Sequence, residues 1–215
     1  MKIGVFDSGM GGLSVANAIK KALPEHEVLF MNDAKNIPYG TKTVEEIYAG
    51  CKPVFDELVL EGCQIIVVAC NTVTTNLIER LRQELPVPLI GMEPMVKPAT
   101  ELTHSKVIAI CATPRTLASA RYKWLKDTYA QGVKVVEPDC SDWTSMIESE
   151  SVDRDKIAAR IDEACDQGAD VIVLGCTHYH WIEDLITELA NGRAKILQPE
   201  QPVIEQLKRV MTQLA

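Results

Sequence analysis

Short apolar runs alternate with longer amphipathic segments along this chain, and that alternation limits its fold more than any other feature. Eight runs rich in β-branched and aliphatic residues have the length and composition of buried strands. These runs are Ile3–Phe6, Glu27–Met31, Gln64–Ala69, Pro88–Gly91, Lys106–Cys111, Val133–Glu137, Asp170–Gly175 and Ala194–Gln198. Helical periodicity marks Leu13–Ala22, Thr43–Glu61, Thr74–Glu84, Thr116–Gln131, Asp153–Gln167 and His180–Ala190. The alternation predicts an α/β fold with mainly parallel sheets flanked by helices.

The two halves of the sequence resemble each other. Lys2–Asp7 opens the first half, and the similar run Lys106–Cys111 opens the second half 104 positions later. Two further strands end at Cys70 and Cys176, which are 106 positions apart. Since two independent landmarks share nearly one offset, the sequence indicates an internal duplication that produces two similar lobes.

The boundary between the lobes is expected near Glu93–Pro98, where two prolines should interrupt regular structure. We expect a first lobe of residues 1–95 plus about 199–215, and a second lobe of residues 96–198. If the two lobes are related by a pseudo-twofold axis, their strand ends face each other. The site is then expected in the cleft between them.

Composition excludes several classes of protein. The 215 residues carry a formal net charge of -8, which argues against a nucleic-acid partner. The chain has no apolar stretch long enough for a membrane span, and its opening run becomes polar too soon for a signal peptide. Seven cysteines without regular close spacing fit reduced thiols in the cytoplasm. We interpret Cys51, Cys63, Cys111 and Cys165 as ordinary buried residues.

Two cysteines stand out because their settings match. Cys70 ends the run Gln64–Ala69, Cys176 ends the run Asp170–Gly175, and small polar residues follow each thiol. Ligands bind at the carboxyl ends of strands in open α/β sheets. Two thiols at two such ends predict a pair of acid/base groups that act on one small molecule from opposite sides. Inversion of a stereocentre needs that pair, so the leading hypothesis is a racemase or epimerase. Zinc sites usually contain closely spaced pairs such as C-x₂-C, which this chain lacks, so no metal is expected.

The residues beside these strands offer further polar groups. Asp7 ends the first strand, and the glycine-rich turn after it could expose backbone N–H groups to an anion. A tight turn without a ligand is the alternative. Asn71 and Thr72 follow one thiol, and Thr177 and His178 follow the other. Their amide, hydroxyl and imidazole groups could orient a substrate, and His178 could assist Cys176.

Five segments form a set of motifs along most of the chain: Phe6–Val15, Asp33–Gly40, Val68–Thr72, Ala112–Thr116 and Leu174–Tyr179. In sequence and in order, these segments closely resemble the glutamate racemases of the cofactor-independent aspartate/glutamate racemase family.

The resemblance implies a two-lobed α/β isomerase that transfers a proton without pyridoxal phosphate or another cofactor. Cys70 and Cys176 would then face opposite sides of the substrate, with Asp7, His178 and Glu148 as supporting catalytic groups. It further implies that a set of small polar residues binds the substrate: Asp7, Ser8, Pro38, Tyr39, Gly40, Asn71, Thr72, Thr113, Thr116, Thr177 and His178. The implied role is the supply of D-glutamate for peptidoglycan, and therefore for the cell wall and cell shape. A homodimer is left open.

Other functions remain as alternatives at this point. The chain departs from the family pattern at His180–Trp181, at Pro138–Thr144 and at Leu197–Pro199, so the substrate could be aspartate or another small acid. A second class is a non-catalytic regulator that binds an amino acid, although such a protein has no need for paired thiols. A third is a redox switch that joins Cys70 to Cys176, which a gap of substrate width opposes.

Overall fold

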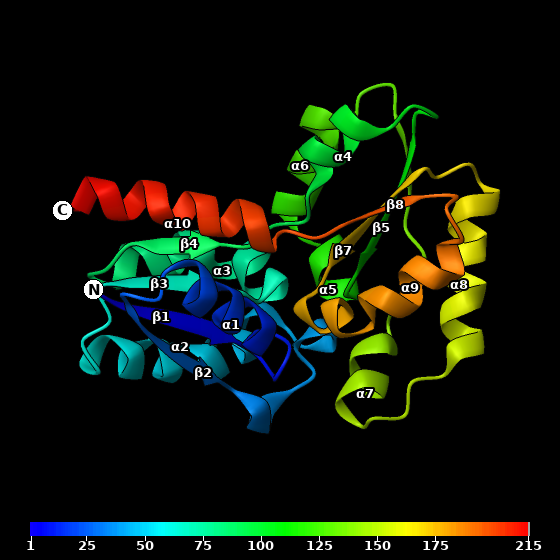
Figure 1. The fold of residues 1–215 in the computed structure, drawn as a ribbon. Coiled ribbons are helices and arrows are strands. Elements are labelled where there is room, and N and C mark those ends of the chain that lie inside the picture. Colours follow the sequence, from blue (N-terminus) through cyan, green and yellow to red (C-terminus); the bar gives the residue numbers. More distant parts are fainter. Residues whose placement is uncertain (215) are drawn as a thin grey trace. The chain divides into compact units, whose positions relative to one another are not determined.

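The computed structural model describes residues 1–214, which form two compact units. Unit 1 contains Met1–Glu93 and the residues from Pro199 onward, and unit 2 contains Pro94–Gln198. Each unit has a four-stranded sheet in which all neighbouring strands are parallel (Figure 1). The predicted α/β class is therefore confirmed.

Unit 1 is built on the sheet order β2-β1-β3-β4. Its strands are β1 (Lys2–Asp7), β2 (Glu27–Asn32), β3 (Ile65–Val68) and β4 (Leu89–Gly91). Its helices are α1 (Leu13–Ala22), α2 (Val44–Leu60), α3 (Asn71–Glu84) and α10 (Glu200–Leu214), with short 3-10 helices η1 (Ala34–Asn36) and η2 (Tyr39–Thr41).

Both faces of the unit 1 sheet are buried, because successive side chains of a strand point to opposite faces. Ile65 and Val67 of β3 pack with α1 and α10, whereas Ile66 and Val68 pack with α2 and α3. The result is a three-layer unit with the sheet in the middle (Figure 1). A strand buried on both sides reads as an unbroken apolar run, which is why the sequence revealed it.

Unit 2 repeats the same strand order, β6-β5-β7-β8. Its strands are β5 (Val107–Ala112), β6 (Lys134–Val136), β7 (Val171–Gly175) and β8 (Lys195–Leu197). Its helices are α4 (Val96–Leu102), α5 (Pro114–Leu117), α6 (Ala120–Tyr129), α7 (Trp143–Glu148), α8 (Arg154–Asp166) and α9 (Glu183–Ala190), with the 3-10 helix η3 (Thr177–Ile182). One face of its sheet packs with α4 and α6, and the other with α7, α8 and α9.

All eight expected strands are present, but several helices differ from the expectation. The helix expected at Thr74–Glu84 begins at Asn71, directly after Cys70. The one expected at Thr116–Gln131 is divided into α5 and α6, because Ser119 caps a new helix through its side chain. The segment expected as a helix from His180 begins as η3 and becomes α-helical only at Glu183.

The proline-rich boundary was also interpreted incorrectly in one respect. Pro98 does not interrupt regular structure, since it lies in the first turn of α4. The first backbone N–H groups of a helix have no partner inside the helix, so proline is tolerated there. Helices α4, α7 and α10 were not expected from the sequence.

Within residues 1–214, none of the helices is long and apolar enough to span a bilayer. In the same residues, no group of three or more histidine, cysteine and acidic side chains has an arrangement that could hold a metal ion.

Candidate active site

Cys70 lies where β3 ends and α3 begins. It is the N-cap residue of α3, and its side chain is only 5% exposed. The thiol donates a hydrogen bond to the Ser8 hydroxyl, with 3.5 Å between Sγ and Oγ. Ser8 follows β1, which is the neighbour of β3 in the sheet, so adjacent strand ends bring the two side chains together. The start of a helix favours negative charge, and this position therefore suits a thiolate.

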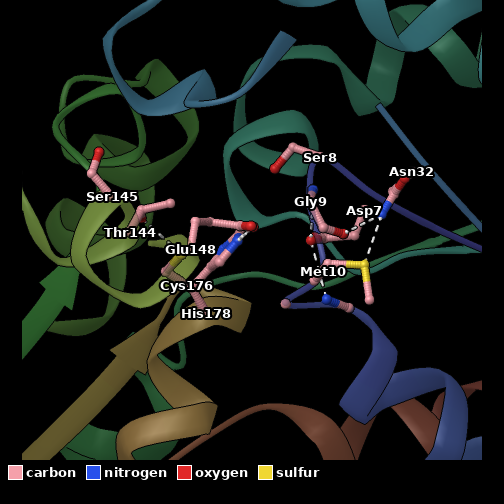
Figure 2. A network of polar contacts seen from close by, with 12 residues as sticks. Asp7, Ser8, Gly9, Met10, Asn32, Thr144, Ser145, Glu148, Cys176 and His178 are labelled. Carbon is pink, nitrogen blue, oxygen red and sulfur yellow. Dashed lines mark hydrogen bonds and ion pairs between the residues drawn. The ribbon is translucent and has the colours of Figure 1, made fainter. Parts of the chain in front are cut away.

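Asp7 organises the turn after β1. Its carboxylate is fully buried and accepts hydrogen bonds from the backbone N–H groups of Gly9 and Gly12, at 3.2 and 3.1 Å (Figure 2). A Cβ atom on Gly12 would lie 2.5 Å from the Asp7 Cβ atom, so only glycine fits there. The expectation that these N–H groups face an external anion is wrong for Gly9 and Gly12, because the Asp7 carboxylate occupies them.

Asn71 carries an unsatisfied buried amide directly after the first thiol. The residue is 2% exposed, and neither Nδ2 nor Oδ1 has a hydrogen-bond partner among residues 1–214. A buried amide without partners costs roughly 1–3 kcal/mol, so such groups usually bind a ligand or an ordered water molecule. Thr72 is likewise buried, one residue further into α3. Both residues lie at the start of the helix, where an anionic group is favoured.

The Pro38–Gly40 segment is held by an aspartate that the sequence analysis did not select. Tyr39 is 2% exposed, and its hydroxyl donates to the buried Asp33 carboxylate at 2.5 Å. Burial, followed by the nearby Asp33 carboxylate, raises the pKa of Tyr39 far above its ordinary value. Gly50 of α2 packs against this pair, and a Cβ atom there would collide with both side chains. The peptide bond before Pro38 is cis.

Cys176 is the corresponding residue of unit 2, where β7 ends and η3 begins. It is 7% exposed, and its Sγ atom lies 3.7 Å from His178 Nδ1 and 3.9 Å from Thr144 Oγ1. His178 is 3% exposed, and its Nε2 atom contacts the Glu148 carboxylate (Figure 2). The three residues Cys176, His178 and Glu148 therefore form a connected chain of thiol, imidazole and carboxylate.

That chain can position and exchange a proton. A carboxylate on Nε2 favours the imidazole tautomer or charge state that carries a proton there. Nδ1 can then accept a proton from the thiol or share one with the thiolate. Glu148 reaches this position from α7, with a side chain that is 22% exposed. The same arrangement occurs in many sites that activate a nucleophile or base.

The remaining selected threonines are buried in unit 2. Thr113 is the N-cap of α5, and its hydroxyl donates to the Thr116 hydroxyl at 3.0 Å and accepts from the Thr116 N–H. Thr177 begins η3 beside Cys176 and is 2% exposed. Thr113 follows β5 and Cys176 follows β7, which are neighbouring strands. These polar residues therefore cluster at the carboxyl ends of the strands in unit 2.

All seven cysteines have free thiols. Cys51, Cys63 and Cys111 are buried in apolar clusters, whereas Cys165 is half-buried and packs at the edge of one. The expectation of buried residues is therefore confirmed for Cys51, Cys63 and Cys111, and it is wrong for Cys165, which is only half-buried.

Two residues that contact the site were missed, Asp33 and Thr144. Thr144 precedes Glu148 by four positions on α7, so both side chains lie on one face of that helix. Recognition of α7 as a helix would have grouped Thr144 with Glu148. Asp33 was within a recognised motif, but only its contact with Tyr39 shows what it does.

The chain is similar to known proteins over almost its whole length. The Asp/Glu/Hydantoin racemase family model matches residues 3–207. The chain is 38% identical over 215 residues to a glutamate racemase of Pseudomonas syringae, a match that covers 98% of this chain and 78% of that protein. It is 39% identical over 211 residues to a glutamate racemase of Clostridium botulinum, with 96% and 82% covered.

Solved structures give the same result. A glutamate racemase isoform from Bacillus anthracis superposes with a TM-score of 0.86 at 26% identity, over 99% of this chain and 82% of that one. The Escherichia coli glutamate racemase, solved with L-glutamate and an activator, gives a TM-score of 0.86 at 25% identity, over 96% and 80%. Together with the match to the family model, these similarities show that the chain belongs to the Asp/Glu/Hydantoin racemase family and is an isomerase of the racemase class.

Proposed function

We propose that this protein interconverts L- and D-glutamate without a cofactor, with Cys70 and Cys176 as the two acid/base groups. The observation that carries the proposal is the matched position of the thiols. Each follows the third strand of a sheet with the same order, and each begins a helix. The identity to curated glutamate racemases selects glutamate among the small acids.

In the proposed reaction, one thiolate removes the proton from the α-carbon of the substrate. The other thiol then donates its S–H proton to the opposite face of the resulting carbanion. One C–H bond breaks and another forms, so the two cysteines exchange protonation states and no electron is gained or lost. The reverse reaction uses the same groups with their roles exchanged.

The neighbouring residues supply orientation and charge in this proposal. Asn71 and Thr72 would bind substrate polar groups at the start of α3, where the unsatisfied amide of Asn71 gains its partners. Ser8, Pro38, Tyr39, Gly40, Thr113, Thr116 and Thr177 would complete substrate binding. Asp7 would act by holding the turn that carries Ser8, and the His178–Glu148 pair would assist Cys176.

The direct test is proton NMR of the purified, reduced protein with L-glutamate in D₂O and no added cofactor. We expect the Cα proton signal to disappear while D-glutamate accumulates, because the returning proton comes from a solvent-exchanged thiol. L-Aspartate is the parallel substrate and should exchange much more slowly. Absence of exchange with glutamate, in folded protein with reduced thiols, would contradict the proposal and favour a binder that lacks turnover.

The proposed biological role is the supply of D-glutamate for peptidoglycan in the cytoplasm, where reducing conditions keep both thiols free. Expression in a bacterium that requires external D-glutamate tests this role. We expect growth without D-glutamate for the native chain and none for the Cys70→Ser chain. Failure of a well-expressed, active enzyme to restore growth would contradict the role but leave the activity intact.

A further inference from the structure

Thr144 contacts the second thiol, Cys176, from helix α7. Its Oγ1 atom lies 3.9 Å from Cys176 Sγ, within hydrogen-bonding range for sulfur, and either atom can be the donor. Figure 2 shows Thr144 and Glu148 on the same side of α7, facing the Cys176–His178 pair. One helix therefore presents both a carboxylate to the imidazole and a hydroxyl to the thiol.

The Thr144 side chain also lies near the phenol of Tyr179, which is fully buried. The Tyr179 hydroxyl donates its own proton to the Cys140 carbonyl at 2.9 Å. Rotation about its C–O bond lets the Thr144 hydroxyl direct its proton either to Cys176 Sγ or away from that sulfur.

Racemisation by two thiols requires Cys176 to exist in two protonation states. As a thiolate it needs hydrogen-bond donors, and as a thiol it needs an acceptor for its S–H group. A hydroxyl supplies either, whereas a backbone carbonyl or N–H group supplies only one. Hydrogen bonds to charged groups are also about twice as strong as those between neutral groups.

On the basis of the proposed function, we propose that Thr144 is a positioning residue that serves both protonation states of Cys176. When Cys176 is a thiolate, the Thr144 hydroxyl donates to the sulfur. When Cys176 is a thiol, its S–H group donates to Thr144 Oγ1, and the Thr144 proton turns away from the sulfur. The hydroxyl thereby stabilises the thiolate without blocking its protonation.

Other titratable groups near Cys176 must be considered in any test. His178 contacts the sulfur, and Glu148 contacts His178. Tyr179, Cys111 and Cys140 belong to the same buried cluster as Cys176. Burial raises the pKa of Tyr179 well above its ordinary value, so this phenol keeps its proton at neutral pH. Substitutions at Thr144 leave all five groups in place.

The test compares Thr144→Val, which keeps the shape without the hydroxyl, with Thr144→Ser, which keeps the hydroxyl. Alkylation of Cys176 by iodoacetamide is followed across pH by peptide mass spectrometry, because only the thiolate reacts. For each variant, the measured quantity is the pH at which the alkylation rate of Cys176 reaches half its maximum, called the midpoint below. In Thr144→Val we expect this midpoint to rise by about one pH unit, which corresponds to an approximately tenfold smaller thiolate population. Thr144→Ser should keep the native midpoint, and Cys70 in each sample serves as an internal reference.

Ser145→Ala is the matched control on α7, because Ser145 is exposed and adjacent to Thr144. It should leave the Cys176 midpoint unchanged. An unchanged midpoint in folded Thr144→Val, or an equal shift in Thr144→Ser, would overturn the inference. The alkylation readout does not depend on turnover, so a protein that shows the shift but fails to racemise glutamate would refute the proposed function and leave the role of Thr144 standing.

Discussion

The two thiols occupy equivalent places in their sheets, yet their supporting carboxylates do different work. In unit 1, the Asp7 carboxylate binds backbone N–H groups of the turn that carries Ser8. In unit 2, the Glu148 carboxylate binds the imidazole that contacts Cys176. The two units thus share the position of the thiol but differ in the side chains that contact it. The common strand order sets the position of each thiol, whereas individual side chains set its hydrogen bonds.

The sharpest test of equivalence is replacement of each thiol by a hydroxyl. Cys70→Ser and Cys176→Ser should each lower kcat by roughly 10²–10⁴-fold, because serine keeps the shape but is a much poorer base. Glutamate affinity, measured by isothermal titration calorimetry, should change only a few-fold by comparison. If one variant lost binding and turnover equally, that thiol would be structural and the two positions would not be equivalent.

The two carboxylates should differ in their effect on stability. Asp7→Ala leaves two buried N–H groups unsatisfied, at a cost of roughly 1–3 kcal/mol for each. Glu148→Ala leaves one imidazole N–H group of His178 unsatisfied. Because the Glu148 side chain is partly exposed, water can reach the space that it vacates and bind this N–H group. We therefore expect the larger decrease in urea midpoint for Asp7→Ala. Equal decreases in the urea midpoint would show that Asp7 and Glu148 contribute equally to stability, contrary to this prediction.

Unit 2 also contains a half-buried histidine, His180, whose two ring nitrogens are buried and which should make stability depend on pH. Burial, with a further contribution from His178, lowers the pKa of His180 from 6.5 to about 4. The unfolded state then binds more protons than the folded state between these values, so stability is lost as pH falls from 6.5 towards 4. The full difference corresponds to about 3 kcal/mol.

Urea unfolding at pH 7.5 and at pH 4.5 measures this effect. His180→Phe should reduce the loss of stability between the two pH values, because phenylalanine fills a similar volume and does not titrate. An identical pH dependence in His180→Phe and the native protein would contradict the prediction.

The residue before each thiol should produce the smallest difference in stability between the two units. Ala69 precedes Cys70, whereas Gly175 precedes Cys176, and a Cβ atom on Gly175 would lie 3.0 Å from the Ala112 Cβ atom and 3.2 Å from the Cys111 carbonyl oxygen. Gly175→Ala should cost about 1–3 kcal/mol through overpacking between β5 and β7. Ala69→Gly should cost about 0.5–1 kcal/mol. A Gly175→Ala protein with native urea midpoint would show that the strands can move apart freely.

Much of the fold could be predicted because its signals are local. Ile65–Val68 and Val171–Gly175 are unbroken apolar runs, and strands buried on both faces produce such runs wherever they occur. Of the helices that were not expected, α7 has a weak signal. Its six residues contain only two buried side chains, Trp143 and Met146, so no amphipathic period is visible there. Helix α10 differs, because its buried residues Val203, Ile204, Leu207 and Met211 follow helical spacing and its signal is present in the sequence.

The sequence by itself determined the α/β class, the eight strands and the position of each thiol after a strand, since these depend on patterns within a few residues. Only the tertiary structure decided that Asp7 occupies the N–H groups of its own turn, that Asp33 binds Tyr39, and that α7 presents Thr144 and Glu148 to Cys176 and His178. The contacts in the last group join residues about 30 positions apart. They depend on the rotation and placement of a whole helix, which packing sets and which no short stretch of sequence records.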